Sequence, residues 1–126
     1  MMSDMADLVK KNMQSWFERE FALDGVLAVG GGVSATSVFA AFAAGEFVLA
    51  SNEEVWRSIG ETVQAVSAHG APTGEMIWGF EHAVLCTICR PDGAWLGVIT
   101  EPQLRDDSAL ALRAKLDAFK QQDFAS

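Results

Sequence analysis

The pattern of apolar and polar positions is clearest between Gly74 and Thr100, where three short apolar runs are separated by turn signals. β-branched, aromatic and other apolar residues dominate each run, as is typical of strands. The turn Arg90-Pro91-Asp92-Gly93 favours a tight hairpin, because proline presets φ and glycine accepts a positive φ. The pattern predicts three consecutive antiparallel strands, at Glu75–Phe80, Ala83–Cys89 and Ala94–Thr100.

Both faces of these strands are apolar. In the first of them, Met76, Trp78 and Phe80 fall on one side and Ile77 on the other. A sheet that is apolar on both faces must be covered on both, either by helices of its own chain or by a partner.

Three other segments carry apolar residues at helical spacing, with polar residues on the opposite side. Before the second of them, Ser51 and Glu54 form the pattern of a capping box. His69, followed by glycine and proline, predicts its end. Asp106 or Asp107 is placed to cap the third. The predicted helices are Met5–Phe21, Asn52–Ala68 and Pro102–Phe119.

The segment between the first two helices is ambiguous. Val26–Val33 has the pattern of a strand. Val38–Phe42 fits a second strand or a short alanine-rich helix beginning near Ser34 or Ser37, because period alone does not separate short apolar runs. Phe47–Ala50 also has strand character. We favour a hairpin here.

The resulting order is helix, two strands, helix, three strands, helix. It predicts an α+β sandwich, in which three helices cover the faces of one five-stranded, mostly antiparallel sheet. The 126 residues, 50% of them hydrophobic, suffice for one domain with its own core. We expect a single domain over residues 1–126.

The net charge of −8 argues against two classes of partner, nucleic acid and anionic membranes. Nucleic acid and anionic membranes bind mainly through basic groups, and no cluster of Lys or Arg is longer than Lys10-Lys11. We therefore expect neither as a partner. The start MMSDMADLVKK lacks the apolar core of a signal peptide, and two cysteines do not make a disulfide framework. The expected location is the cytoplasm.

One uncharged stretch, Gly25–Gly45, is about as long as a membrane span. Its five glycines and its acidic flanks, Asp24 and Glu46, argue against insertion. We expect no membrane-spanning helix.

A glycine run within this stretch suggests an alternative function. Gly30, Gly32 and Ala35 match the spacing G-x-G-x-x-A, with Glu46 downstream. Such a loop holds a dinucleotide only where a helix follows immediately and points its N-terminus at the pyrophosphate. Repeated βαβ units are absent, and a lone motif is weak. We expect no cofactor, and keep a nucleotide or small-molecule sensor using Gly30–Gly32 as the alternative.

Cys86 and Cys89 form a CxxC pattern, four residues after His82. A metal or redox site requires these groups to converge. In a strand, however, an offset of three sends the two cysteines to opposite faces. We expect buried thiols and no metal site. The other histidine and the carboxylates fall at predicted element ends, where capping and solubility explain them, so we assign no catalytic residue and expect no enzyme.

The excess of large apolar side chains is more informative, with four tryptophans and eight phenylalanines. A sheet edge at Glu75–Phe80 that carried Met76, Trp78 and Phe80 would be an aggregation hazard unless it paired. Pairing with a second copy would extend the sheet across a two-fold axis, and Trp56 and its helix would pack against the twin helix.

Five features mark the chain as a whole: the opening amphipathic helix, Asp24-Gly25-Val26, Phe47-Val48-Leu49-Ala50-Ser51, Pro91-Asp92-Gly93, and Leu96-Gly97-Val98-Ile99-Thr100 before the closing helix. Together they resemble the roadblock family, the dynein light-chain-like domains that also occur widely in bacteria. The resemblance covers nearly the whole chain and consists of element order and apolar pattern. It departs at Val33–Gly45, where roadblock domains usually have a short turn.

The resemblance implies a roadblock/profilin-like sandwich and a non-catalytic homodimer or heterodimer. The sheets would join through Glu75–Phe80, with the helix Asn52–Ala68 at the interface. Members of the family act as scaffolds and as regulators of small Ras-like GTPases or motor complexes. The interface positions that carry over are Trp56, Ile59, Met76 and Trp78.

Overall fold

The computed structural model describes residues 2–34, 36–43, 52–69 and 74–125. The predicted order of elements is confirmed, with boundaries that shift by a few residues. The elements are α1 (Met2–Glu20), β1 (Val26–Gly32), β2 (Val38–Ala43), α2 (Glu53–Ala68), β3 (Glu75–Gly79), β4 (Val84–Cys89), β5 (Trp95–Thr100) and α3 (Asp106–Gln121).

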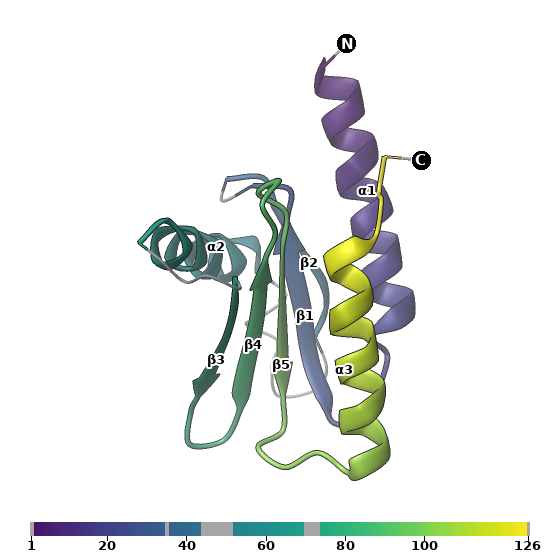
Figure 1. The fold of residues 1–126 in the computed structure, drawn as a ribbon, viewed down its shortest axis with the longest axis vertical. Helices are drawn as coiled ribbons and strands as arrows, with labels where there is room; N and C mark the ends of the chain where they lie inside the picture. The colour runs from purple at the N-terminus through teal and green to yellow at the C-terminus, as the bar shows by residue number, and fades with distance from the viewer. Residues whose placement is uncertain (1, 35, 44–51, 70–73, 126) are drawn as a thin grey trace.

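The five strands form one antiparallel sheet in the order β2-β1-β5-β4-β3. Helices α1 and α3 lie against one face and α2 lies on the other, and the first turns of α1 project beyond the sheet (Figure 1). The α+β class and the sandwich of three helices around five strands are therefore confirmed. None of the described helices combines the length and the apolar character needed to cross a membrane.

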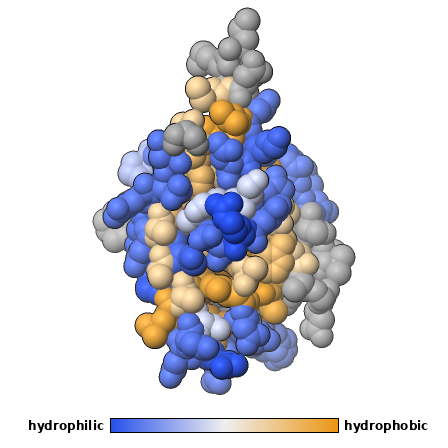
Figure 2. All heavy atoms as spheres, turned by 90° about the vertical axis from the view of Figure 1, so that its right-hand side faces the viewer, coloured by the Kyte–Doolittle hydropathy of each residue, from blue (hydrophilic) through white to orange (hydrophobic). Residues whose placement is uncertain are grey.

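Strand alternation divides the core into two layers. On β5, Leu96 and Val98 face α1 and α3, where they join a cluster containing Phe17 and Phe119. Trp95 faces the other way and packs with Ala28, Val38 and Trp56 of α2. The outer surface of the α1–α3 layer shows hydrophilic residues around hydrophobic ones (Figure 2).

The β1–β2 segment is a hairpin, as favoured from the sequence, and the alternative helix is not formed. The strand conformation is stable here because β1 pairs on both sides and β2 buries Val38 toward α2 and Phe39 toward α1. The register shifts at Val29/Gly30, which marks a bulge. The other predicted strand, Phe47–Ala50, lies outside the described residues.

The starts of all three helices differ from prediction, and α1 begins at Met2 and not at Met5. The N-cap of α2 is Asn52, whose Oδ1 accepts a hydrogen bond from the Glu54 amide at 2.9 Å. Ser51, the predicted cap, lies outside the described residues. Helix α3 begins at Asp106, not at Pro102, because Leu104 packs onto the core and holds the preceding residues in an irregular connection. Asp106 and Asp107 therefore occupy its first turn, where their charge favours the helix dipole, and the N-cap position is Arg105. Asp107 Oδ1 accepts a hydrogen bond from the Ser108 amide at 2.9 Å, so it satisfies one amide of this first turn.

Candidate interaction surface

The edge of the sheet at β3 is open on its outer side, since no other described strand pairs there. Two hydrogen bonds fix which way its backbone groups point: the Cys89 amide donates to the Gly74 carbonyl and the Phe80 amide donates to the Ala83 carbonyl. The register between them is unbroken. Antiparallel pairing alternates, so the even-numbered residues bond to β4 and the amide and carbonyl of Ile77 point outward. This edge is a template for another strand.

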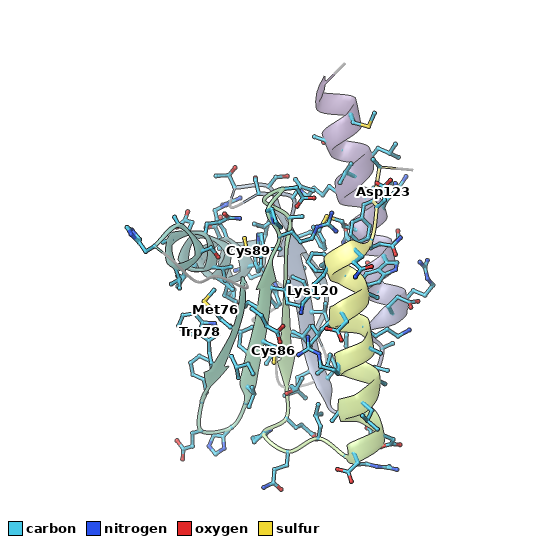
Figure 3. The ribbon with its side chains drawn as sticks, viewed as in Figure 1. Met76, Trp78, Cys86, Cys89, Lys120 and Asp123 are labelled. Atoms are coloured by element: carbon cyan, nitrogen blue, oxygen red, sulfur yellow. The ribbon has the colours of Figure 1, made fainter. Side chains whose placement is uncertain are left out.

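The side chains at this edge are apolar on both faces. Ile77 lies on the α3 side with 70% of its surface exposed, and Phe80, just past the strand, is 61% exposed. Met76 and Trp78 lie on the α2 side and are half-buried; both stand at the outer edge of the sheet (Figure 3). Large apolar side chains this exposed at an unpaired edge are typical of surfaces that bind another protein.

A groove runs between α2 and the outer strands. It consists of two adjoining hollows of about 220 and 490 Å³ that share Ile59, Phe80 and Leu85. Trp78 lines the first and Ile99 the second. The groove is almost wholly apolar and continues the apolar surface of β3.

Three of the four predicted interface residues lie on this surface. Ile59 lines both hollows, Trp78 lines one, and Met76 lies two residues away on the same face of β3. Trp56 does not, because its indole is fully buried in the core between α2 and the sheet. Trp56 therefore fixes α2 to its own sheet and has no surface to offer a partner.

Ile77 and Phe80 were not among the predicted interface residues. The sequence pattern could have indicated both residues, because Ile77 and Phe80 lie in the predicted edge strand. Ile77 falls on the face opposite to Met76 and Trp78. What the sequence does not reveal is that α3 stops short of covering Ile77.

The beginning of β3 is tied to α3 by an ion cluster. The Glu75 carboxylate lies 2.6 Å from Arg113 Nη1 and 3.0 Å from Lys120 Nζ. Hydrogen bonding to Arg113, helped by Lys120, lowers the pKa of Glu75 from 4.5 to about 2. The cluster holds the edge strand in place and leaves the apolar residues beyond it uncovered.

The opposite edge of the sheet, β2, is less accessible to an added strand. Gln14 of α1 donates through Nε2 to the Ala40 carbonyl at 3.2 Å. The neighbouring bulge in the β1–β2 pairing interrupts the regular ladder. Side-chain cover and bulges are both devices that discourage another strand from adding to an edge. Of the two edges, β3 is the better suited to pairing.

The glycine run lies inside β1 and is explained by packing. A Cβ at Gly30 would overlap the Trp56 indole, and one at Gly31 would overlap Phe17 and the Trp95 carbonyl. The residues after the run form β2 and not a helix, so the N-terminus that a dinucleotide loop needs is missing from this place. Glu46 lies outside the described residues.

Cys86 and Cys89 face opposite sides of the sheet, as predicted: Cys86 pairs with Ile77 and Val98, and Cys89 pairs with Trp95 (Figure 3). Burial raises the pKa of both thiols, which makes them poor nucleophiles at neutral pH. His82 lies in an exposed turn beside Glu81. The described part of the chain holds no group of three or more His, Cys, Asp or Glu side chains arranged to bind a metal.

Comparison with known proteins suggests no function, so the proposal below rests on this surface. The chain matches no protein-family model, and no curated protein or solved structure is significantly similar to it.

Proposed function

We propose that this chain is a non-catalytic self-association module, and that its β3–α2 surface binds a second copy. The observation that carries the proposal is the outward-facing backbone of Ile77 at the edge of the sheet. The exposed Ile77 side chain lies on one face of this edge, and the apolar groove beside α2 lies on the other. A second copy is the natural occupant, because an antiparallel edge paired with itself across a two-fold axis satisfies the same groups on both chains.

The energetics favour association. Removing Ile77 and Phe80 from water contributes about 1–2 kcal/mol for each side chain on each protomer. The backbone bonds at the edge and the apolar lining of the groove add to this gain. The total free-energy gain must exceed the cost of the rotational and translational freedom lost on association, which is on the order of several kcal/mol. An isolated exposed side chain could not meet that requirement, but a continuous strand and groove can.

The element order and apolar pattern extend the proposal beyond self-association. They resemble the roadblock family, so we propose that the dimer acts as a scaffold that regulates a partner protein, with a small Ras-like GTPase as the first class to test. Titrating the dimer with purified GTPases of the same organism, in GDP-bound and GTP-analogue-bound forms, tests this part. Saturable binding to one form supports it, and no binding to any contradicts it.

Self-association is tested by the solution mass of three proteins: wild type, Ile77→Lys and Leu8→Lys. Leu8 is a matched control, since it is 46% exposed and lies on α1, which packs against β1 and β2 at the other end of the sheet. We chose Ile77 over Trp78 because Trp78 is half-buried beside Ile59 and Leu85, so its replacement would remove packing within the chain as well.

By light scattering after size exclusion, we expect wild type and Leu8→Lys to show twice the chain mass of 13.6 kDa. Ile77→Lys should show the single-chain mass, because an ammonium group would stand in the apolar surface that the second copy is proposed to cover. A wild-type protein that is monomeric at high micromolar concentration, or an Ile77→Lys protein that still dimerises, would contradict the proposal.

A further inference from the structure

No contact or backbone angle in the described part of the chain explains the glycine at position 79. Glycine weakens a strand, and it is usually retained there for a positive φ or for close packing. Among the described residues, the glycines with positive φ are Gly25, Gly74 and Gly93. A Cβ built on Gly79 meets nothing within 4 Å.

Other glycines of the sheet and of α2 are required by close packing, because a Cβ atom at their positions would overlap a neighbouring ring. A Cβ at Gly60 would lie 2.7 Å from the Trp95 ring, and one at Gly97 would lie 2.9 Å from the Trp56 ring. Gly79 lies on the open edge, where glycine often marks the close approach of another chain. Neither a positive φ nor close packing among the described residues accounts for Gly79, and its open position suits the approach of a second chain.

The outward-facing backbone groups limit how two β3 strands can pair. They belong to odd-numbered residues, and a two-fold axis perpendicular to the sheet relates equal positions. Within β3, the axis can therefore pass beside Met76, Ile77 or Trp78. Each choice sets different side chains opposite one another.

The axis beside Trp78 is disfavoured by packing. It sets the exposed Ile77 opposite the partner's Gly79, which has no side chain to bury it. The axis beside Met76 sets Glu75 opposite the partner's Ile77, which presses a carboxylate against an apolar side chain that the dimer should bury.

We propose that the two chains pair with the axis beside Ile77, so that Ile77 faces the partner's Ile77 and Gly79 faces the partner's Glu75. This inference rests on the proposed self-association and specifies its register. The two isoleucines exchange backbone hydrogen bonds and bury each other's side chains. The missing side chain at Gly79 leaves room for the carboxylate of the partner's Glu75 and the Arg113 and Lys120 groups bound to it.

The other face of the sheet is equally well matched in this register. Met76 stands opposite the partner's Trp78 at a position where side chains are closest. Methionine sulfur packs favourably against an indole. The two-fold axis repeats this pair, and both α2 helices then lie on the same face of a ten-stranded sheet.

Disulfide trapping tests the register. Cys86 lies directly opposite Ile77 on β4, so both native cysteines are first replaced by serine to prevent a bond within the chain. Met76→Cys, Ile77→Cys and Trp78→Cys are then made singly and oxidised with copper phenanthroline. In the proposed register the two Cα atoms of residue 77 are about 5.5 Å apart, within disulfide range. Those of residue 76, and likewise of residue 78, are about 8 Å apart, beyond that range.

We expect covalent dimers from Ile77→Cys at least about tenfold faster than from the other two variants. Faster trapping at Met76→Cys or Trp78→Cys, in a protein that is dimeric by mass, overturns the register and leaves self-association standing. A wild type that is monomeric overturns both.

Gly79→Val provides a second test that does not depend on cysteine chemistry. Valine favours a strand and fits the open space in the single chain, so the unfolding midpoint of the monomer should not fall. The dimer dissociation constant should rise at least about fivefold, because the new side chain competes with the partner's ion cluster for space. An unchanged dissociation constant would overturn the role given to Gly79.

Discussion

The fit between tryptophan rings and glycines decides how α2 sits on the sheet. Trp56 occupies the space left by Gly30 and Gly97, and its ring centroid lies 6.4 Å from that of Trp95. Trp95 in turn occupies the space left by Gly60 and donates through Nε1 to the Ser34 carbonyl at 3.1 Å. The sequence shows rings and glycines separately, but which ring meets which glycine depends on the helix crossing the sheet. For this reason Trp56 was wrongly expected at the surface.

Gly30→Ala tests this fit. The new methyl group would overlap the Trp56 indole, so we expect a loss of about 1–3 kcal/mol in the free energy of unfolding. Urea denaturation measures it, in the Ile77→Lys background so that association does not contribute. Gly79→Ala in the same background is the control and should lose nothing, since its Cβ meets open space. Equal losses in the two variants would show that the ring does not rest on Gly30.

At the scale of elements, most of the fold is predictable from the sequence. The hairpin turn before Ala94 and the apolar runs of β4 and β5 mark the meander, and helical spacing marks all three helices. The hairpin at β1–β2 was favoured but ambiguous, because an alanine-rich run fits both a helix and a strand until its pairing partner is known. The caps were less predictable, since the choice between adjacent capping residues depends on local geometry that spacing does not fix.

Strand β3 is tied to α3 at its first residue, Glu75, by the ion pairs with Arg113 and Lys120. Glu75 has a pKa near 2 in the folded chain, below its ordinary value of 4.5. The cluster therefore contributes stability that is fully present above pH 4.5. This contribution is lost as the pH falls toward 2 and the carboxylate is protonated.

Glu75→Gln should reveal this pH dependence. At pH 7 we expect it to lower the free energy of unfolding by about 1 kcal/mol, as for a partly exposed network of ion pairs. The difference from wild type should shrink below pH 4.5 and disappear near pH 2. Chemical denaturation across this range measures it, with the highly exposed Glu81→Gln as the control. A difference that stays constant down to pH 2 would mean that the carboxylate charge is not what stabilises the strand.

At the scale of the whole molecule, the two edges of the sheet are unequal. The β2 edge is partly covered by Gln14 and interrupted by a bulge, whereas the β3 edge carries exposed apolar residues beside a groove. A sheet with one suitable edge forms a closed pair, while two suitable edges would build a fibre. The net charge of −8 further discourages indiscriminate association. We therefore expect association to stop at two copies.

The most direct test of this account is amide hydrogen exchange along β3 as a function of protein concentration. The amides of Met76 and Trp78 point toward β4 and should be protected at every concentration. The Ile77 amide points outward. We expect it to be protected in concentrated wild-type protein and to exchange rapidly on dilution, or in a monomeric variant at any concentration. Rapid exchange of Ile77 in concentrated wild type, beside protected neighbours, would show that the edge stays open and would contradict the account.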